Sequence, residues 1–160
     1  MMLALVVWLG ALIFFPVVAH TAFSVFPTRY VAGLMVRNSL IVLHWMGMIS
    51  GVIFLASSLL YERLGRGQLS LLKIFRPCHI FLAVMLALTM FSQFRIIPSM
   101  DELRLSVGEI ASLPASDPRR TQFDSLHVSS THFEEAVLLL GLIVLYSTSW
   151  RLSRTISSRA

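Results

Sequence analysis

Four long apolar stretches dominate the pattern of hydrophobic and polar positions along this chain. They cover residues 2–26, 39–61, 77–97 and 131–150. The first two contain no charged side chain, the third contains only Arg95, and the fourth contains only Glu134 and Glu135 near its start. Each stretch is close to or above the roughly 20 apolar residues that an α-helix needs to cross a bilayer core. The pattern therefore predicts an all-α bundle of four transmembrane helices.

The longest polar interval, residues 98–130, is expected to be the only sizeable segment outside the membrane. Ser99 and Glu102 fit a capping box directly after Pro98. An apolar stripe at helical spacing follows, made of Met100, Leu103, Val107 and Ile110. We expect a short amphipathic helix in this third connection.

The same interval contains a second helix start. Asp117 is suited to cap a helix and Pro118 to occupy its first position. No breaker follows before Trp150, so one helix is expected to run from the polar interval through the fourth span.

Composition places the chain among integral membrane proteins. Of 160 residues, 56% are hydrophobic and only 13% are charged, which is too apolar for a soluble domain of this size. A single domain over residues 1–160 is expected, with the lipid bilayer as its first partner. The formal net charge of +5 concerns orientation and anionic lipid in such a protein, and no nucleic-acid signature is present. Cys78 is the only cysteine, which excludes an internal disulfide.

The distribution of lysine and arginine predicts the topology. The connection 62–76 and the tail after residue 150 together hold seven basic residues against one acid, whereas the connections 27–38 and 98–130, with the adjoining helix ends, hold six against seven. By the positive-inside rule, both termini are cytoplasmic and residues 98–130 are extracytoplasmic. A plasma (inner) membrane location is expected.

One helix face in the second span is marked for close packing. Gly47 and Gly51 form a small-xxx-small pair, which lets a neighbouring helix approach. His44 lies three residues before Gly47 and shares this face, so its side chain should point into the bundle.

Candidate chemistry gathers toward the extracytoplasmic leaflet. In the predicted topology His20 and His44 lie about 8–9 Å from the outer ends of their spans, at 1.5 Å per residue. His127 and His132 lie near the outer end of the fourth span. Imidazole nitrogens bind copper, zinc and haem iron, so His20, His44 and His127 form a candidate cofactor site, with copper and haem b as the possible cofactors.

A polar stripe on the fourth helix would support this site. Asp124, His127, Thr131 and Glu134 recur at helical spacing. Asp124 and Glu134, with His132 nearby, are candidate hydrogen-bond partners that orient His127. Asp124 and Glu134 could instead pair with Arg37 or Arg95.

One alternative competes with the cofactor hypothesis. Each histidine could simply pair with a carboxylate or backbone group inside the bundle, as any intramembrane polar group must. Catalysis is not expected, because no nucleophile is accompanied by a base and an orienting group. The hydroxyls of Ser129, Ser130 and Thr131 are expected to bond back to carbonyls of their own helix or to cap it.

Three sequence motifs resemble a known family. They are WLGALIFFPVVAHTAF near the start, IIPSMDELR after the third span and FDSLHVSST before the fourth. Together they resemble the small four-helix membrane proteins similar to transmembrane protein 205, a domain of unknown function. The resemblance implies a four-helix membrane protein without an established enzymatic activity. Where that family commonly has an Ala-Pro pair this chain has Ala19 and His20, so the resemblance implies no role for His20.

Two functions therefore remain in view. The first is a non-enzymatic membrane protein that binds a metal ion or haem at the outer histidine cluster. The second is a structural or accessory subunit of a larger membrane complex, in contact with pigment or lipid and with other membrane subunits.

Overall fold

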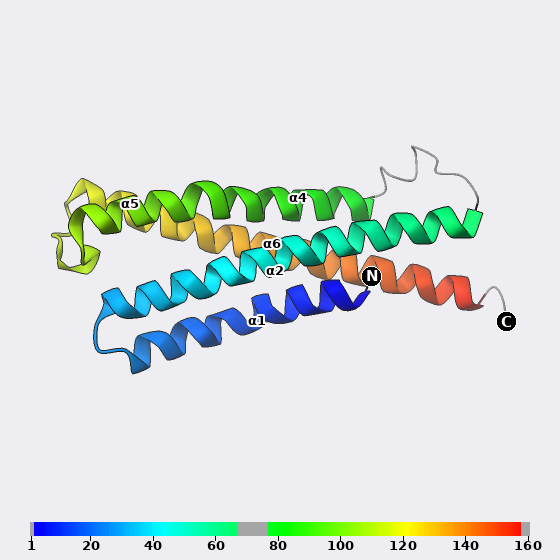
Figure 1. Cartoon of the computed structure of the whole chain (residues 1–160), viewed down its shortest axis with the longest axis horizontal. Coiled ribbons are helices and arrows are strands. Elements are labelled where there is room, and N and C mark those ends of the chain that lie inside the picture. The colour runs from blue at the N-terminus through cyan, green and yellow to red at the C-terminus, as the bar shows by residue number, and fades with distance from the viewer. Residues whose placement is uncertain (1, 67–76, 158–160) are drawn as a thin grey trace.

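The computed structural model describes residues 2–66 and 77–157, and within them the secondary structure is helical without any strand (Figure 1). The helices are α1 (Met2–Val25), α2 (Arg29–Arg66), α4 (Pro77–Phe91), the π-helical segment η1 (Ser92–Ile96), α5 (Ile97–Val107), the 3-10 turn η2 (Ile110–Ser112) and α6 (Pro118–Ser157). Around the bundle α1 contacts α2, α2 contacts α4, α4 contacts α6, and α6 contacts α1. Four helices are long and apolar enough to cross a membrane. The predicted four-helix bundle is confirmed.

The turn between the first two helices is shorter than the predicted 27–38 connection. α2 begins at Arg29, so only residues 26–28 separate it from α1. Thr28 caps the new helix, because its Oγ1 accepts a hydrogen bond of 3.2 Å from the amide of Val31. A single glycine, Gly33, does not stop a helix that packing supports. Arg37 therefore lies on a helix and not in a loop.

The third span does not end at residue 97. α4, η1 and α5 follow one another without a break from Pro77 to Val107 (Figure 1). In the π-helical segment the amide of Ile97 bonds to the carbonyl of Ser92, five residues back. This wider turn accommodates Pro98, whose ring would otherwise press against the preceding turn.

The predicted capping box is therefore wrong. Ile96 occupies the N-cap position of α5 without a side-chain hydrogen bond, because the preceding helical turns continue directly into α5. Residues 97–107 are helical, but they extend the third helix and do not form a separate short helix. The chain leaves this helix at Gly108, whose φ of 80° lies in the region that favours glycine.

The fourth helix begins where predicted. Asp117 Oδ1 accepts a hydrogen bond of 2.8 Å from the amide of Arg119, and Pro118 occupies the first helical position. The Arg119 side chain also bonds to this carboxylate and holds the pKa of Asp117 below its ordinary value. α6 then runs unbroken through the predicted end at Trp150 to Ser157.

Glycines bring α1, α2, α4 and α6 together. A Cβ at Gly47 would collide with the indole of Trp8, and a Cβ at Gly51 would lie 2.7 Å from Leu86 Cδ2. Trp8 is 1% exposed and belongs to the main core with Leu82 and Val144. The predicted packing role of Gly47 and Gly51 is confirmed, as is the inward orientation of His44, which is also 1% exposed.

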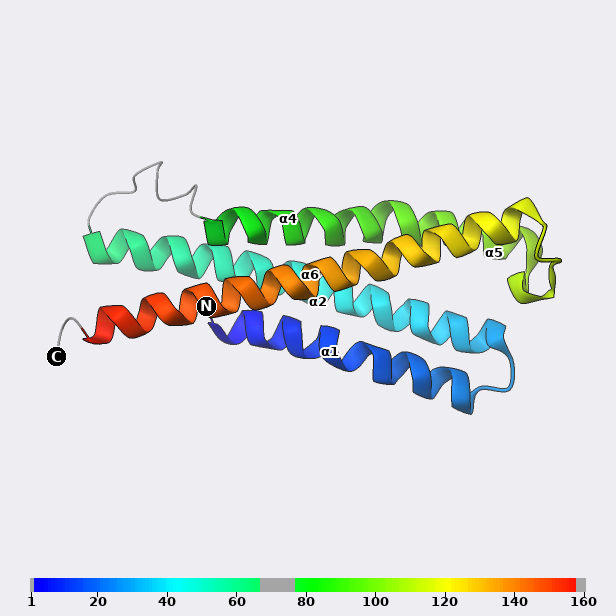
Figure 2. The same ribbon diagram turned by 180° about the vertical axis from the view of Figure 1, so that it is seen from behind.

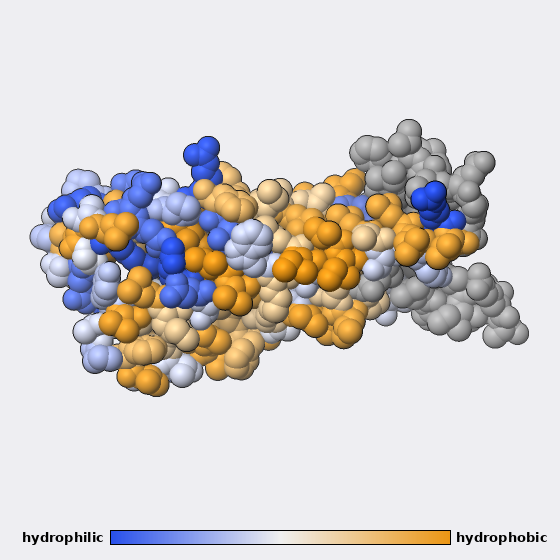
Figure 3. Space-filling model, in the orientation of Figure 1, coloured by the Kyte–Doolittle hydropathy of each residue, from blue (hydrophilic) through white to orange (hydrophobic). Residues whose placement is uncertain are grey.

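The outer surface matches a lipid environment over the middle of the bundle. Large apolar side chains are exposed on the helices, among them Phe14, Val42, Ile49 and Leu139. Figure 3 shows hydrophobic residues over this middle region, whereas hydrophilic residues gather over α5 and the start of α6. The basic residues Lys73 and Arg76, on which the topology prediction partly depends, lie outside the described residues.

Candidate functional site

A cavity of about 360 Å³ lies between α1, α2, α5 and α6, toward the end of the bundle that holds the α1–α2 turn. We call it the lateral cavity. Its wall is mainly apolar and includes Leu12, Phe15, Phe23, Val36, Leu40, Ile97, Met100 and Leu138. Its polar lining consists of Arg37, Asp101, Arg104, His127, Ser130, Thr131, Glu134 and Glu135.

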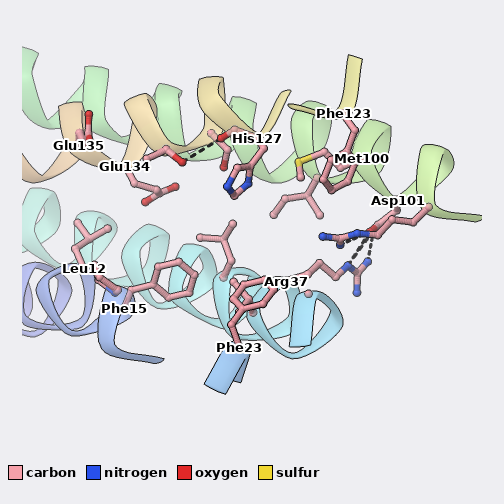
Figure 4. Close-up of a pocket in the computed structure, with 18 of the residues that line it drawn as sticks. Leu12, Phe15, Phe23, Arg37, Met100, Asp101, Phe123, His127, Glu134 and Glu135 are labelled. Carbon is pink, nitrogen blue, oxygen red and sulfur yellow. Dashed lines mark hydrogen bonds and ion pairs between the residues drawn. The ribbon is translucent and has the colours of Figure 1, made fainter. Parts of the chain in front are cut away.

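The divergence of two helices creates this space. α1 separates from α6 as both approach the α1–α2 end of the bundle (Figures 1 and 2). Several residues of the cavity wall are exposed, including Pro16 and Phe23 on α1 and His127 and Thr131 on α6. The cavity therefore reaches the surface between α1 and α6. In Figure 4, His127 and Glu134 project from α6 toward Leu12 and Phe15 of α1.

At the deeper end of the cavity, a buried histidine joins three helical segments. His44 Nε2 lies 2.6 Å from Glu134 Oε1, and His44 Nδ1 lies 2.9 Å from Gln93 Oε1. His44 comes from α2, Gln93 from η1 and Glu134 from α6. The Glu134 side chain is 16% exposed and lines the lateral cavity, whereas His44 is fully buried behind it. Glu134 thus connects the cavity to an internal polar network.

This network can exist in three proton arrangements. A protonated imidazole donates from both nitrogens, which matches the two oxygen atoms that face it. A neutral imidazole either donates from Nδ1 to Gln93 and accepts at Nε2 from a protonated Glu134, or donates from Nε2 to Glu134 while the Gln93 amide turns its NH₂ group toward Nδ1. A carboxyl group and an amide held on either side of an intramembrane histidine satisfy its polar atoms in each case.

At the outer end of the cavity, two arginines meet one carboxylate. Arg37 Nε lies 3.1 Å and 2.9 Å from the two oxygens of Asp101, and its Nη2 also bonds to that carboxylate. Arg104 Nη1 is 3.8 Å from Asp101 Oδ1, and its guanidinium lies 5.1 Å from the ring centre of Phe123. The Arg37–Asp101 pair joins α2 to α5 and is visible at one end of Figure 4.

A second cavity of about 200 Å³ adjoins the first toward the extramembrane segment. We call it the outer cavity. It shares Phe23, Gly33, Arg104 and Phe123 with the lateral cavity. The rest of its lining is more polar and consists of Arg29, Tyr30, Gly108, Glu109, Ile110, Ala111, Arg120 and Asp124.

The structure separates the three histidines of the predicted cofactor site. His20 is exposed on α1 and does not line the lateral cavity, and both ring nitrogens of His44 have partners. Only His127 faces the cavity. Among residues 2–66 and 77–157, no group of three or more His, Cys, Asp or Glu side chains is arranged to hold a metal ion.

The residues predicted to orient His127 lie apart from one another as well. Glu134 pairs with His44 and not with His127, because Glu134 and His127 lie two turns, about 10.5 Å, apart along α6. Asp124 lines the outer cavity, and His132 is exposed. The polar stripe itself is well placed, since His127, Thr131 and Glu134 all line the lateral cavity. Thr131 Oγ1 donates to the carbonyl of His127, as expected for a hydroxyl that bonds back to its own helix.

Two residues of the site were not predicted from the sequence. They are Gln93, which contacts His44, and Arg104, which lines both cavities. Gln93 was visible as a polar residue inside an apolar span, which is the usual signal for an intramembrane contact. Arg104 stands in the polar interval, where its charge alone does not distinguish it from its neighbours. His79, at the start of the third apolar stretch, is buried at 5% exposure, and its Nε2 lies 2.9 Å from Ser58 Oγ.

Comparison with known proteins identifies a family without an assigned activity. The family model described as "Domain of unknown function (DUF4149)" matches residues 3–108. The match covers α1 to α5 and ends before α6, so it does not include His127 or Glu134. It supports a family of unknown function but not the narrower resemblance to transmembrane protein 205. No curated protein and no solved structure matches the chain.

Proposed function

This chain belongs to the DUF4149 family, and we propose that it is a non-enzymatic membrane protein that binds a lipid-like molecule in the lateral cavity. The observation that carries the proposal is the cavity itself. Its volume of about 360 Å³ lies within the range of small-molecule sites. An apolar wall with a few convergent polar groups is the usual lining of such sites.

Position supports a ligand that comes from the membrane. The cavity lies within helices that are long and apolar enough to cross a bilayer, and it reaches the surface between α1 and α6. A lipid-like molecule could enter from this side without crossing water. An opening between two spans favours a ligand with an apolar chain over a small hydrated one.

The geometry favours such a ligand over a metal ion or haem. His44 is occupied by Gln93 and Glu134, and His20 does not reach the cavity. His127 alone would remain as an imidazole ligand. A non-enzymatic role is supported by the hydroxyls near His127, because Ser129 and Thr131 donate to carbonyls of α6 and are not activated by a neighbouring base.

We further propose that both termini are cytoplasmic in a plasma (inner) membrane, so that the cavity opens toward the extracytoplasmic leaflet. The excess of basic residues in 62–76 and after residue 150 supports this orientation. Single cysteines at Ser106 and Ser157, in a Cys78→Ser background, test it with an impermeant thiol reagent on intact cells. Labelling at position 106 alone is expected, and labelling at position 157 alone would invert the orientation.

Filling the cavity tests ligand binding. Val36 lines the lateral cavity, whereas Val42 is on the same helix and 66% exposed on the outer surface. In Val36→Trp the indole should occupy the cavity, and in Val42→Trp it should face lipid. Native mass spectrometry after mild-detergent extraction should show a bound lipid-like molecule on the wild type and on Val42→Trp, and much less on Val36→Trp.

The same measurement bears on the alternative of an accessory subunit. A chain that always carries other membrane subunits and no small molecule would refute the proposal. Equal ligand occupancy in the two tryptophan variants would show that the molecule binds elsewhere.

A further inference from the structure

Arg104 has fewer partners than a largely buried guanidinium normally has. Its side chain is 15% exposed. The nearest carboxylate, Asp101, lies 3.8 Å away and is already bonded by Arg37 through both of its oxygens. Among the described residues no hydrogen bond from the Arg104 guanidinium to an acceptor is found, although a guanidinium carries five N–H donors.

Arg104 lies at the junction of the two cavities. Arg104 is one of four residues that line both the lateral cavity and the outer cavity. Its guanidinium lies over the ring of Phe123, with the ring centre 5.1 Å away, and this contact places it at the junction. Its donors therefore border the space where an apolar cavity meets a polar one.

The charges around the junction leave a positive excess. Arg29, Arg104 and Arg120 line the outer cavity against Glu109 and Asp124. Arg120 is held in place, because its Nη1 donates to the carbonyl of Leu113 at 2.8 Å. At the lateral side, Arg37 and Asp101 neutralise each other.

We infer that the lateral and outer cavities form one site for an anionic amphiphile, with its phosphate-bearing headgroup on Arg104 and its apolar chain in the lateral cavity. The inference rests on the proposed function and names the ligand class. Arginine binds phosphate oxygens through charge-assisted, often bidentate hydrogen bonds. The hydrophilic end of the bundle in Figure 3 is where lipid headgroups would lie.

The length of the site suits a chain rather than a compact ligand. Phe123 borders the junction, and Leu138 lines the far end of the lateral cavity. These two residues are about 22 Å apart along α6, at 1.5 Å per residue. Glu134 and Glu135 line the part toward Leu138, so an anionic group is favoured only at the Arg104 end.

Comparison of two lipids tests the headgroup assignment. The full chain, purified in detergent and freed of lipid, is titrated with dioleoyl phosphatidylglycerol and with dioleoylglycerol, which has the same acyl chains but no phosphate, and binding is followed by native mass spectrometry. Hydrogen bonds to a charged group should give the wild type roughly a tenfold preference for phosphatidylglycerol. Inorganic phosphate is titrated in parallel, and the proposal expects it neither to bind as tightly nor to displace the lipid.

Two arginine variants separate headgroup recognition from general electrostatics. Arg104→Gln should lose most of the preference while still binding both lipids weakly through the cavity. Arg119→Gln is the matched control. Arg119 lies at the start of α6, at the same end of the bundle, but it is 50% exposed and lines neither cavity. It should keep the wild-type preference.

Each outcome has a distinct meaning. Equal affinity of the wild type for the two lipids would overturn the headgroup assignment and leave the lateral cavity as a lipid site, and this comparison does not depend on any variant folding. An equal loss in the two arginine variants would assign the preference to net charge instead of to Arg104. Tight binding of phosphate alone would assign a free-anion site. Absence of binding by either lipid would refute the proposed function itself.

Discussion

Removal of the Glu134 carboxylate should destabilise the bundle more than removal of the adjacent Glu135 carboxylate. Glu134 accepts or shares the proton of a 2.6 Å hydrogen bond with a histidine that is 1% exposed. In Glu134→Leu, His44 Nε2 would lose its partner within the bundle. Glu135 is exposed and also lines the lateral cavity, so Glu135→Leu is a control with the same change in charge and size.

The expected magnitude follows from the environment of the pair. Breaking a buried ion pair costs about 3–5 kcal/mol in soluble proteins. Interhelical hydrogen bonds in membranes contribute less, about 0.6 kcal/mol on average and about 1.7 kcal/mol at most, because the unfolded chain in the membrane also finds partners. The short distance and complete burial of His44 favour the upper end, so we expect Glu134→Leu to cost about 1.5 kcal/mol. Glu135→Leu should cost less than about 0.5 kcal/mol.

Unfolding in mixed detergent micelles, followed by circular dichroism, measures these differences. A double-mutant cycle with His44→Leu isolates the interaction, and the double variant should be more stable than the sum of the two single losses predicts. A coupling energy below about 0.5 kcal/mol would refute the reasoning, because sites that do not interact are additive within that error. So would equal destabilisation by Glu134→Leu and Glu135→Leu.

Two further predictions concern packing and capping. Gly47→Ala should destabilise the bundle by about 1–3 kcal/mol, because its Cβ would collide with Trp8. Gly10→Ala is the control and should not destabilise the bundle, since nothing lies within 4 Å of a Cβ there. Similar unfolding curves for the two variants would contradict this packing. Since hydrogen bonds from Arg119 hold the pKa of Asp117 below its ordinary value, the ionised cap stabilises the folded state at neutral pH and loses this contribution as pH falls through the lowered pKa. Asp117→Asn should keep a cap without this titration, so thermal unfolding between pH 7 and pH 3 should show a steeper loss for the wild type, and parallel losses would argue against the cap.

The pattern of apolar runs in the sequence was sufficient to predict the architecture. Apolar runs of the length of a bilayer core leave few alternatives to spanning helices, because an unpaired backbone group in lipid is costly. The predicted positions of the helix ends were less accurate. Arg29 to Asn38 looks like a connection by charge, yet it is helical, and Pro98 to Val107 extends the third helix instead of forming a separate one, since packing of the helix ends outweighs these local signals.

The sequence by itself determined which residues share a face of one helix. The spacing of His44, Gly47 and Gly51 placed all three toward the bundle, and the stripe of His127, Thr131 and Glu134 lines the lateral cavity. Helical periodicity is local, so it can be read along a single segment.

Only the tertiary structure decided which faces meet. The partner of Glu134 is His44, 90 residues away, because the axial offset and rotation of α2 against α6 bring them together. The π-helical segment adds a second reason. An extra residue in one turn shifts everything after it by about 100° around the helix axis, and Gln93 lies within that turn. Periodicity carried forward from Pro77 therefore assigns the wrong face to the residues beyond this segment.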